Sequence, residues 1–131
     1  MSHKLDPLLK PESVALVGAS ERENSPGRVL ANMVINSEFG GDIYPINPGY
    51  QSIFGKPCYT NLDALPKKVD HVIIALGVEK LEASLRAAIE HGARAATIFS
   101  STTLERDVEP HLQTRLTTMA EAAGIHICGA N

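Results

Sequence analysis

Short apolar segments alternate with amphipathic segments along almost the whole chain, and this alternation limits the possible folds more than any other feature of the sequence. Short apolar runs are typical of buried strands, and apolar residues spaced three and four apart are typical of helices that cover a sheet. Strands connected through helices form parallel sheets with right-handed crossovers. The sequence therefore predicts an α/β fold with a doubly wound, mainly parallel sheet.

The expected elements follow from the same pattern. Strands are predicted at Ser13–Val17, Asp42–Ile46, around Pro57-Cys58-Tyr59, and at His71–Leu76, Ala95–Phe99 and Ile125–Cys128. A first helix should start with Ser25 as its N-cap and Pro26 in its first turn, and bury Val29, Leu30, Met33 and Val34. Later helices should bury Leu81, Leu85, Ala88 and Ile89 before Gly92, and Leu112, Leu116, Met119, Ala120 and Ala123 before Gly124. Residues 50–68 form a looser segment, with a helical turn expected at residues 61–65.

Length and charge restrict the classes of protein. A chain of 131 residues suits one domain, and a net charge of -3 leaves no basic face for nucleic acid. Charge and proline interrupt the first residues, and no long apolar run follows, so we expect a cytoplasmic protein without membrane contact. Cys58 and Cys128 are expected to be reduced and buried. The chain stops three residues beyond its last predicted strand, which favours an N-terminal piece of a longer protein over a free-standing domain.

The candidate site lies where a doubly wound sheet binds ligands, beyond the carboxyl ends of its strands. Residues 18–28 leave a predicted strand and open a helix, whose free N–H groups and positive dipole end favour an anion. Arg22 and Arg28 add positive charge there, and Gly27 allows close approach of a phosphate. The alternative is that Gly18 and Gly27 serve only the turn and the helix packing.

Common nucleotide and catalytic motifs are missing. The loop has neither the GxGxxG spacing nor an acidic residue closing the second strand, which disfavours NAD, and the sequence contains no GxxxxGK[ST]. The histidines show no metal-ligand spacing, and the run at residues 100–103 lacks a GxSxG motif or a positioned base. His91, before Gly92, suits a cation at a helix C-terminus. We therefore expect binding without turnover in these residues.

Four segments in register resemble a known family. They are SVALVGAS at residues 13–20, YPINP at 44–48, VDHVII at 69–74 and GAN at 129–131. Together they resemble the coenzyme-A-binding domain of ADP-forming acyl-CoA synthetases and, more distantly, the α subunit of succinyl-CoA synthetase. The same module resembles the front part of some bacterial protein acetyltransferases. The resemblance covers nearly the whole chain.

The resemblance implies a Rossmann-like domain with strand order 3-2-1-4-5-6, in which the piece near Cys58 is the third strand. It also implies that coenzyme A (CoA) lies across the strand ends. The site residues expected to contact its phosphates and adenine are Gly18, Ala19, Ser20, Arg22, Ser25, Pro26, Gly27, Arg28, Asn47, Pro48, Tyr50, Leu76, Gly77, Phe99, Ser100 and Ser101. Tyr50 stands where the succinyl-CoA synthetase relative has a lysine, Gly77 where synthetases often have proline, and Ala130 where the family has another proline. Tyr50 either stacks on adenine or is simply a surface residue.

Three hypotheses follow for function. In the first, the chain is the CoA-binding domain of an ADP-forming acyl-CoA ligase, whose downstream domains perform phosphoryl transfer and thioester formation. In the second, it is a free-standing module that senses CoA or another nucleotide. The third and weakest is a degenerate NAD(P)-binding domain. The expected ligand in the first reading is CoA or an acyl-CoA, with no nucleic acid and no metal.

Overall fold

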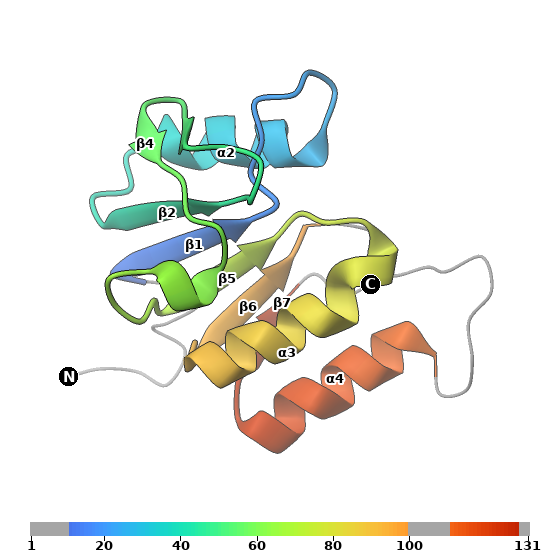
Figure 1. Ribbon diagram of the computed structural model, residues 1–131. Helices are drawn as coiled ribbons and strands as arrows, with labels where there is room; N and C mark the ends of the chain where they lie inside the picture. The colour runs from blue at the N-terminus through green and yellow to red at the C-terminus, as the bar shows by residue number, and fades with distance from the viewer. Residues whose placement is uncertain (1–10, 100–110, 129–131) are drawn as a thin grey trace.

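A parallel sheet forms the centre of the protein in a computed structural model, in which residues 11–99 and 111–128 are described (Figure 1). The sheet contains β1 (Ser13–Val17), β2 (Asp42–Ile46), β5 (His71–Ile74), β6 (Ala95–Ile98) and β7 (His126–Cys128). Their order is β2-β1-β5-β6-β7, and every pair is parallel. The predicted Rossmann-like α/β class is confirmed. The last three strands are each slightly shorter than the sequence predicted.

The segment near Cys58 takes the position of the third strand, but it forms much less sheet than a full strand would. Residues of β3 (Ser52–Ile53) and β4 (Lys56–Pro57) pair with each other as an antiparallel hairpin. Only Tyr59 joins the main sheet, through a single parallel bridge to Ile46 at the end of β2. Pro57 has no N–H group to donate to a neighbouring strand. The order 3-2-1-4-5-6 thus holds, with one bridge in place of a full third strand.

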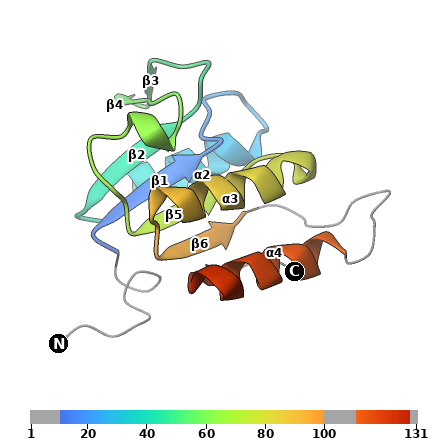
Figure 2. The same ribbon diagram turned by 60° about the horizontal axis from the view of Figure 1, so that its bottom comes forward.

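Helices cover both faces of the sheet. In Figures 1 and 2, α2 (Pro26–Ile35) lies on one face, while α3 (Leu81–His91) and α4 (Leu112–Ala123) lie side by side on the other. The start of α2 is as predicted, because the Ser25 side chain accepts a hydrogen bond from the backbone N–H of Arg28 and Pro26 occupies the first turn. The short 3₁₀ helices η1 (Leu62–Ala64) and η2 (Val78–Lys80) precede β5 and α3, respectively.

Alternate side chains of β1 face two different cores. Val14 and Leu16 pack on the α2 side with Leu30 and Ala31, whereas Ala15 packs on the α3 and α4 side. The predicted buried face of α2 is wrong in part, since the side chains of Val29 and Met33 are each 55% exposed. The inward residues of α2 are Gly27, Leu30 and Ala31, so its buried face is narrow and contains small residues.

The two cysteines differ in their surroundings. Cys58 is half-buried, and its thiol donates a hydrogen bond to the carbonyl oxygen of Asn47 at 3.4 Å. Burial raises the pKa of the Cys58 thiol, which keeps it protonated. Cys128 is exposed, so the expectation that it is buried is wrong, because β7 is an edge strand. None of the helices that the structure describes is both long and apolar enough to span a bilayer.

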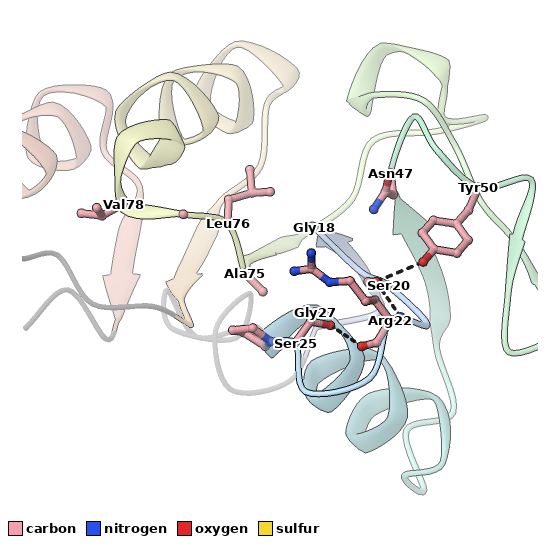
Figure 3. Close-up of a pocket in the computed structure, with 12 residues that line it drawn as sticks. Gly18, Ser20, Arg22, Ser25, Gly27, Asn47, Tyr50, Ala75, Leu76 and Val78 are labelled. Carbon is pink, nitrogen blue, oxygen red and sulfur yellow. Dashed lines mark hydrogen bonds between the residues drawn. The ribbon is translucent and has the colours of Figure 1, made fainter.

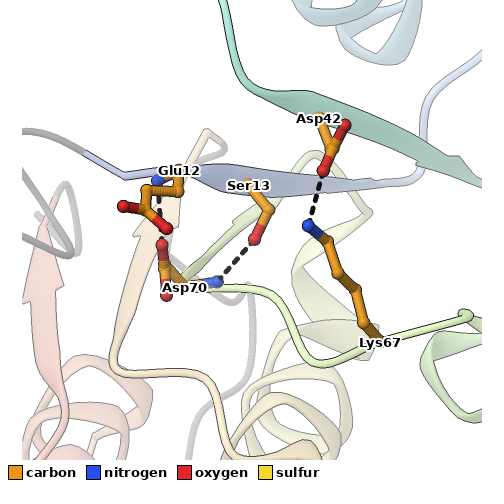
Figure 4. Close-up of polar contacts among 5 residues, drawn as sticks. All are labelled: Glu12, Ser13, Asp42, Lys67 and Asp70. Atoms are coloured by element: carbon orange, nitrogen blue, oxygen red, sulfur yellow. Dashed lines mark hydrogen bonds and ion pairs between the residues drawn. The ribbon is translucent and has the colours of Figure 1, made fainter.

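Polar contacts hold the amino ends of the strands together (Figure 4). The backbone N–H of Glu12 donates to the Asp70 carboxylate at 2.8 Å, and the backbone N–H of Asp70 donates to the Ser13 hydroxyl at 3.2 Å. Lys67 pairs with Asp42 at 2.5 Å between exposed side chains. These contacts connect β1, β2 and the entry to β5 at the end of the sheet opposite the candidate site.

Candidate functional site

A pocket of about 710 Å³ opens at the carboxyl ends of β1, β2 and β5, where the start of α2 faces the loops that follow β2 and β5 (Figure 3). Its lining residues are Gly18, Ser20, Arg22, Ser25, Pro26, Gly27, Asn47, Tyr50, Ala75, Leu76, Gly77 and Val78. Ten of these twelve residues were predicted as site residues, and they come together because parallel strands bring their carboxyl ends to one edge of the sheet.

 

Glycine is required at two points where this pocket meets the sheet. Gly18 has a φ of +89°, and a Cβ there would overlap the carbonyl oxygen of Ala75. A Cβ on Gly27 would overlap the carbonyl oxygen of Gly18 at the end of β1. Both glycines therefore have the packing role that the sequence left open. The contact between Gly27 and Gly18 also brings the first turn of α2 directly onto the carboxyl end of β1.

Several backbone amides of the loop are already used. The N–H of Gly18 donates to the carbonyl oxygen of Ile46 at 3.0 Å, and that of Ala19 donates to Leu16 at 3.3 Å. The Ser25 hydroxyl accepts from the N–H of Arg28. Within the part of the chain that the structure describes, the N–H of Gly27 makes no hydrogen bond. The free donor at this helix start is thus Gly27 rather than Gly18 or Ala19.

The two arginines of the loop lie in different places. Arg22 lines the pocket, and Figure 3 shows its side chain extending across the mouth toward Ala75 and Leu76. No contact among the described residues pairs its guanidinium. The Arg28 guanidinium instead donates to the carbonyl oxygen of Glu21 and lies 5.5 Å from the centre of the Phe54 ring. Arg22 is therefore the loop arginine that is available to an anion.

Side chains of the turn after β2 hold the loop in place. The Asn47 amide donates to the carbonyl oxygen of Ala19 at 2.9 Å, and its side-chain oxygen accepts from the N–H of Gly49 at 2.8 Å. The Tyr50 hydroxyl is 3.2 Å from that of Ser20, which also accepts from the N–H of Arg22. Asn47 and Tyr50 thus shape the pocket wall and fix the residues that carry its positive charge.

The remaining predicted site residues lie in several positions. Leu76 and Gly77 line the pocket after β5, whereas Ala19 is fully buried behind the loop. Phe99 follows β6 and packs, half-buried, on the α2 side of the sheet. Pro48 is exposed and lines a neighbouring pocket. Ser100 and Ser101 lie outside the described residues.

A second pocket of about 360 Å³ adjoins the first on the α3 side of the strand ends. It shares Gly18, Asn47 and Leu76 with the first pocket and is also lined by Val17, Ile46, Pro48, Thr60, Asn61, Leu62, Lys80, Ser84 and Ala87. The residues of η1 and α3 in this set were not predicted from sequence. Lys80 could have been found, because it lies in the short connection between a predicted strand and the helix after it.

His71 and His91 both make hydrogen bonds to other parts of the fold. The Nε2 atom of His91 accepts a hydrogen bond from the backbone N–H of Val69 at 3.1 Å, and burial lowers the pKa of His91. The expectation that His91 is a cation at this helix end is therefore wrong, because its imidazole accepts this hydrogen bond as a neutral group. His71 is buried beside Thr97. Within residues 11–99 and 111–128, no three His, Cys, Asp or Glu side chains form a group that could hold a metal ion.

Comparison with known proteins identifies related chains. A model of the CoA binding domain matches residues 12–131. The chain is 33% identical over 131 residues to a trans-feruloyl-CoA synthase from an unknown prokaryotic organism, and 29% identical over 128 residues to an ADP-forming acetate–CoA ligase of Archaeoglobus fulgidus. These matches cover 99% and 97% of this chain, but 18% of each relative.

Solved structures with the same fold include both long and short chains. A dinucleotide-forming acetyl-coenzyme A synthetase of Ca. Korarchaeum cryptofilum, in complex with phosphate and ADP, superposes with a TM-score of 0.86 and 27% identity, over 97% of this chain and 27% of that one. A conserved hypothetical protein of Pyrococcus furiosus matches with a TM-score of 0.72 and 23% identity, over 92% of this chain and 94% of that one. The fold therefore also occurs as nearly a whole short chain.

Proposed function

The chain belongs to the CoA binding domain family, and from this membership we propose that it binds CoA across the carboxyl ends of β1, β2 and β5. The observation that carries the proposal is the pocket of about 710 Å³ in which the start of α2, a free Gly27 N–H and the Arg22 guanidinium face one space. An N–H group at a helix start and an arginine both favour phosphate oxygens.

In this proposal the diphosphate of CoA lies against Gly27 and Arg22. The packing of Gly27 on Gly18 brings the first turn of α2 to this pocket, and Arg22 reaches the same mouth from the loop. The apolar side chains of Leu76 and Val78 on the opposite wall suit the pantetheine arm. The adenosine extends over Asn47 into the second pocket, which shares that residue with the first. Tyr50 positions Ser20 beside the phosphates.

The parent protein that we propose is an ADP-forming acyl-CoA ligase. The support is the similarity to an ADP-forming acetate–CoA ligase over nearly this whole chain, which spans 18% of that relative. The domain would hold CoA while other parts of the protein activate the acyl group and form the thioester. The likeness to a short Pyrococcus furiosus chain supports a free-standing CoA-binding module as the second candidate.

The lining of both pockets disfavours NAD as the ligand. Rossmann domains that bind NAD use a carboxylate after the second strand to hold the ribose hydroxyls. Asn47 occupies that position, and its side chain is used by Ala19 and Gly49. No aspartate or glutamate is among the described residues that line either pocket.

Titration calorimetry of the protein with CoA and with NAD tests this function. We expect heat of binding with CoA and none with NAD. Arg22→Ala should weaken CoA binding by about tenfold or more, since a hydrogen bond between charged groups contributes about 1.5–3 kcal/mol. Arg86→Ala is the matched control, because Arg86 is exposed on α3 and pairs with Glu82. Binding of NAD but not of CoA would refute the proposal.

A further inference from the structure

Lys80 is the cationic side chain of the second pocket. It ends η2, just before α3, and lines the pocket together with Thr60, Asn61 and Ser84. The side chain is exposed, and no hydrogen bond or ion pair among the described residues engages its ammonium group. A lysine at a pocket rim without a protein partner is available to an anionic part of a ligand.

The two adjoining pockets each contain one positive side chain. Among their described lining residues, Arg22 is the cation of the first pocket and Lys80 that of the second, and neither pocket has a lining carboxylate. Tyr50, on the β2 side of the first pocket, is uncharged and its hydroxyl contacts Ser20. The pair of pockets therefore suits an elongated ligand with two separate anionic groups.

CoA has two such groups, the diphosphate and the phosphate monoester on the 3′-hydroxyl of its ribose. A phosphate monoester carries nearly two negative charges at neutral pH and binds best beside a cation. In the CoA pose proposed above, with the diphosphate at Arg22, the adenosine ribose lies on the side of the second pocket, which adjoins the first. We propose that Lys80 binds the 3′-phosphate of CoA and makes the protein select CoA over 3′-dephospho-CoA, an inference that rests on the proposed function.

Calorimetric titration of four proteins with CoA and 3′-dephospho-CoA tests the role of Lys80. The proteins are the unaltered chain, Lys80→Ala, Lys80→Arg and Lys68→Ala. The unaltered chain should prefer CoA by about tenfold or more, since charge-assisted contacts contribute that much. Lys80→Ala should abolish the preference by weakening CoA binding alone, and Lys80→Arg should largely retain it.

Lys68→Ala is the matched control, because Lys68 is exposed near Gly92 at the far end of α3. It should keep the preference for CoA. Equal affinity of the unaltered chain for both ligands, or a preference that persists in Lys80→Ala, would overturn the role of Lys80 while leaving the proposed function intact. Failure of the unaltered chain to bind either ligand would overturn both.

Discussion

His71 is a buried histidine of β5 whose Nε2 atom lies 2.7 Å from the Thr97 hydroxyl on β6. Burial lowers its pKa from 6.5 to about 4, since the charged imidazolium loses its hydration inside the protein. The folded protein therefore holds His71 neutral at pH values where the unfolded chain protonates it. His71 is therefore one source of the dependence of stability on pH.

We predict that the free energy of unfolding decreases as the pH falls from about 6.5 to about 4, because the unfolded state binds more protons across that range. His71 should account for a loss of about 3 kcal/mol in the free energy of unfolding over this range, at about 1.36 kcal/mol for each pKa unit. His71→Val should reduce this acid dependence in urea titrations at several pH values. Thr97→Val keeps the imidazole and should retain the dependence. An equal slope in His71→Val would contradict the prediction.

The loop between β1 and α2 depends on the segment that follows β2. Asn47 fixes Ala19, Tyr50 fixes Ser20, and the Glu21 carboxylate accepts from the N–H of Phe54 at 2.8 Å. These contacts join residues about thirty positions apart in sequence. The shape of the proposed phosphate site is thus set by a segment outside the helix start itself.

Asn47→Ala should lower the free energy of unfolding by about 1–2 kcal/mol, because it leaves the Ala19 carbonyl and the Gly49 N–H without their partner. Chemical denaturation measures the change. Asn32→Ala is the control, since it removes a contact between Asn32 and Asn36 on the exposed side of α2, and should change stability by less than about 0.5 kcal/mol. Equal effects of the two substitutions would contradict this role of Asn47.

The sequence was sufficient to predict some elements and not others. Ser25 and Pro26 indicated the start of α2, because capping depends on local residue types. The exposure of Val29 and Met33 was not predictable from apolar spacing, since small residues at Gly27 and Ala31 let a different face of the helix approach the sheet. The hairpin of residues 52–57 was also missed, because two-residue strands leave almost no periodic pattern.

Ligand binding should stabilise the fold as a whole. CoA at about one hundred times its dissociation constant should raise the free energy of unfolding by about 2.7 kcal/mol, because only the folded chain presents both pockets. Thermal unfolding with CoA measures this as a higher Tm, and NAD at the same concentration is the control. An unchanged Tm at saturating CoA would contradict the prediction.

The location of the candidate site was predictable because topology determines it. Parallel strands place residues 18, 47 and 76 at one edge, whatever the details of the side chains. The sequence could not predict which of Arg22 and Arg28 has a guanidinium available to a ligand. That depends on the Phe54 ring and the Glu21 carbonyl, which both contact Arg28. Lys80 was missed as a site residue because the second pocket forms only when η1 packs near α3.

Gly18 lines both pockets and also lies against Ala75, where a side chain would not fit. A substitution of Gly18 would therefore impair folding and ligand binding together. Its phenotype could not be assigned to one of these two effects. Substitutions at the rim of the pockets are more informative, because Arg22 and Lys80 are exposed there. A genetic screen for variants that fold but do not bind ligand should therefore recover charge changes at Arg22 and Lys80 and no substitutions of Gly18.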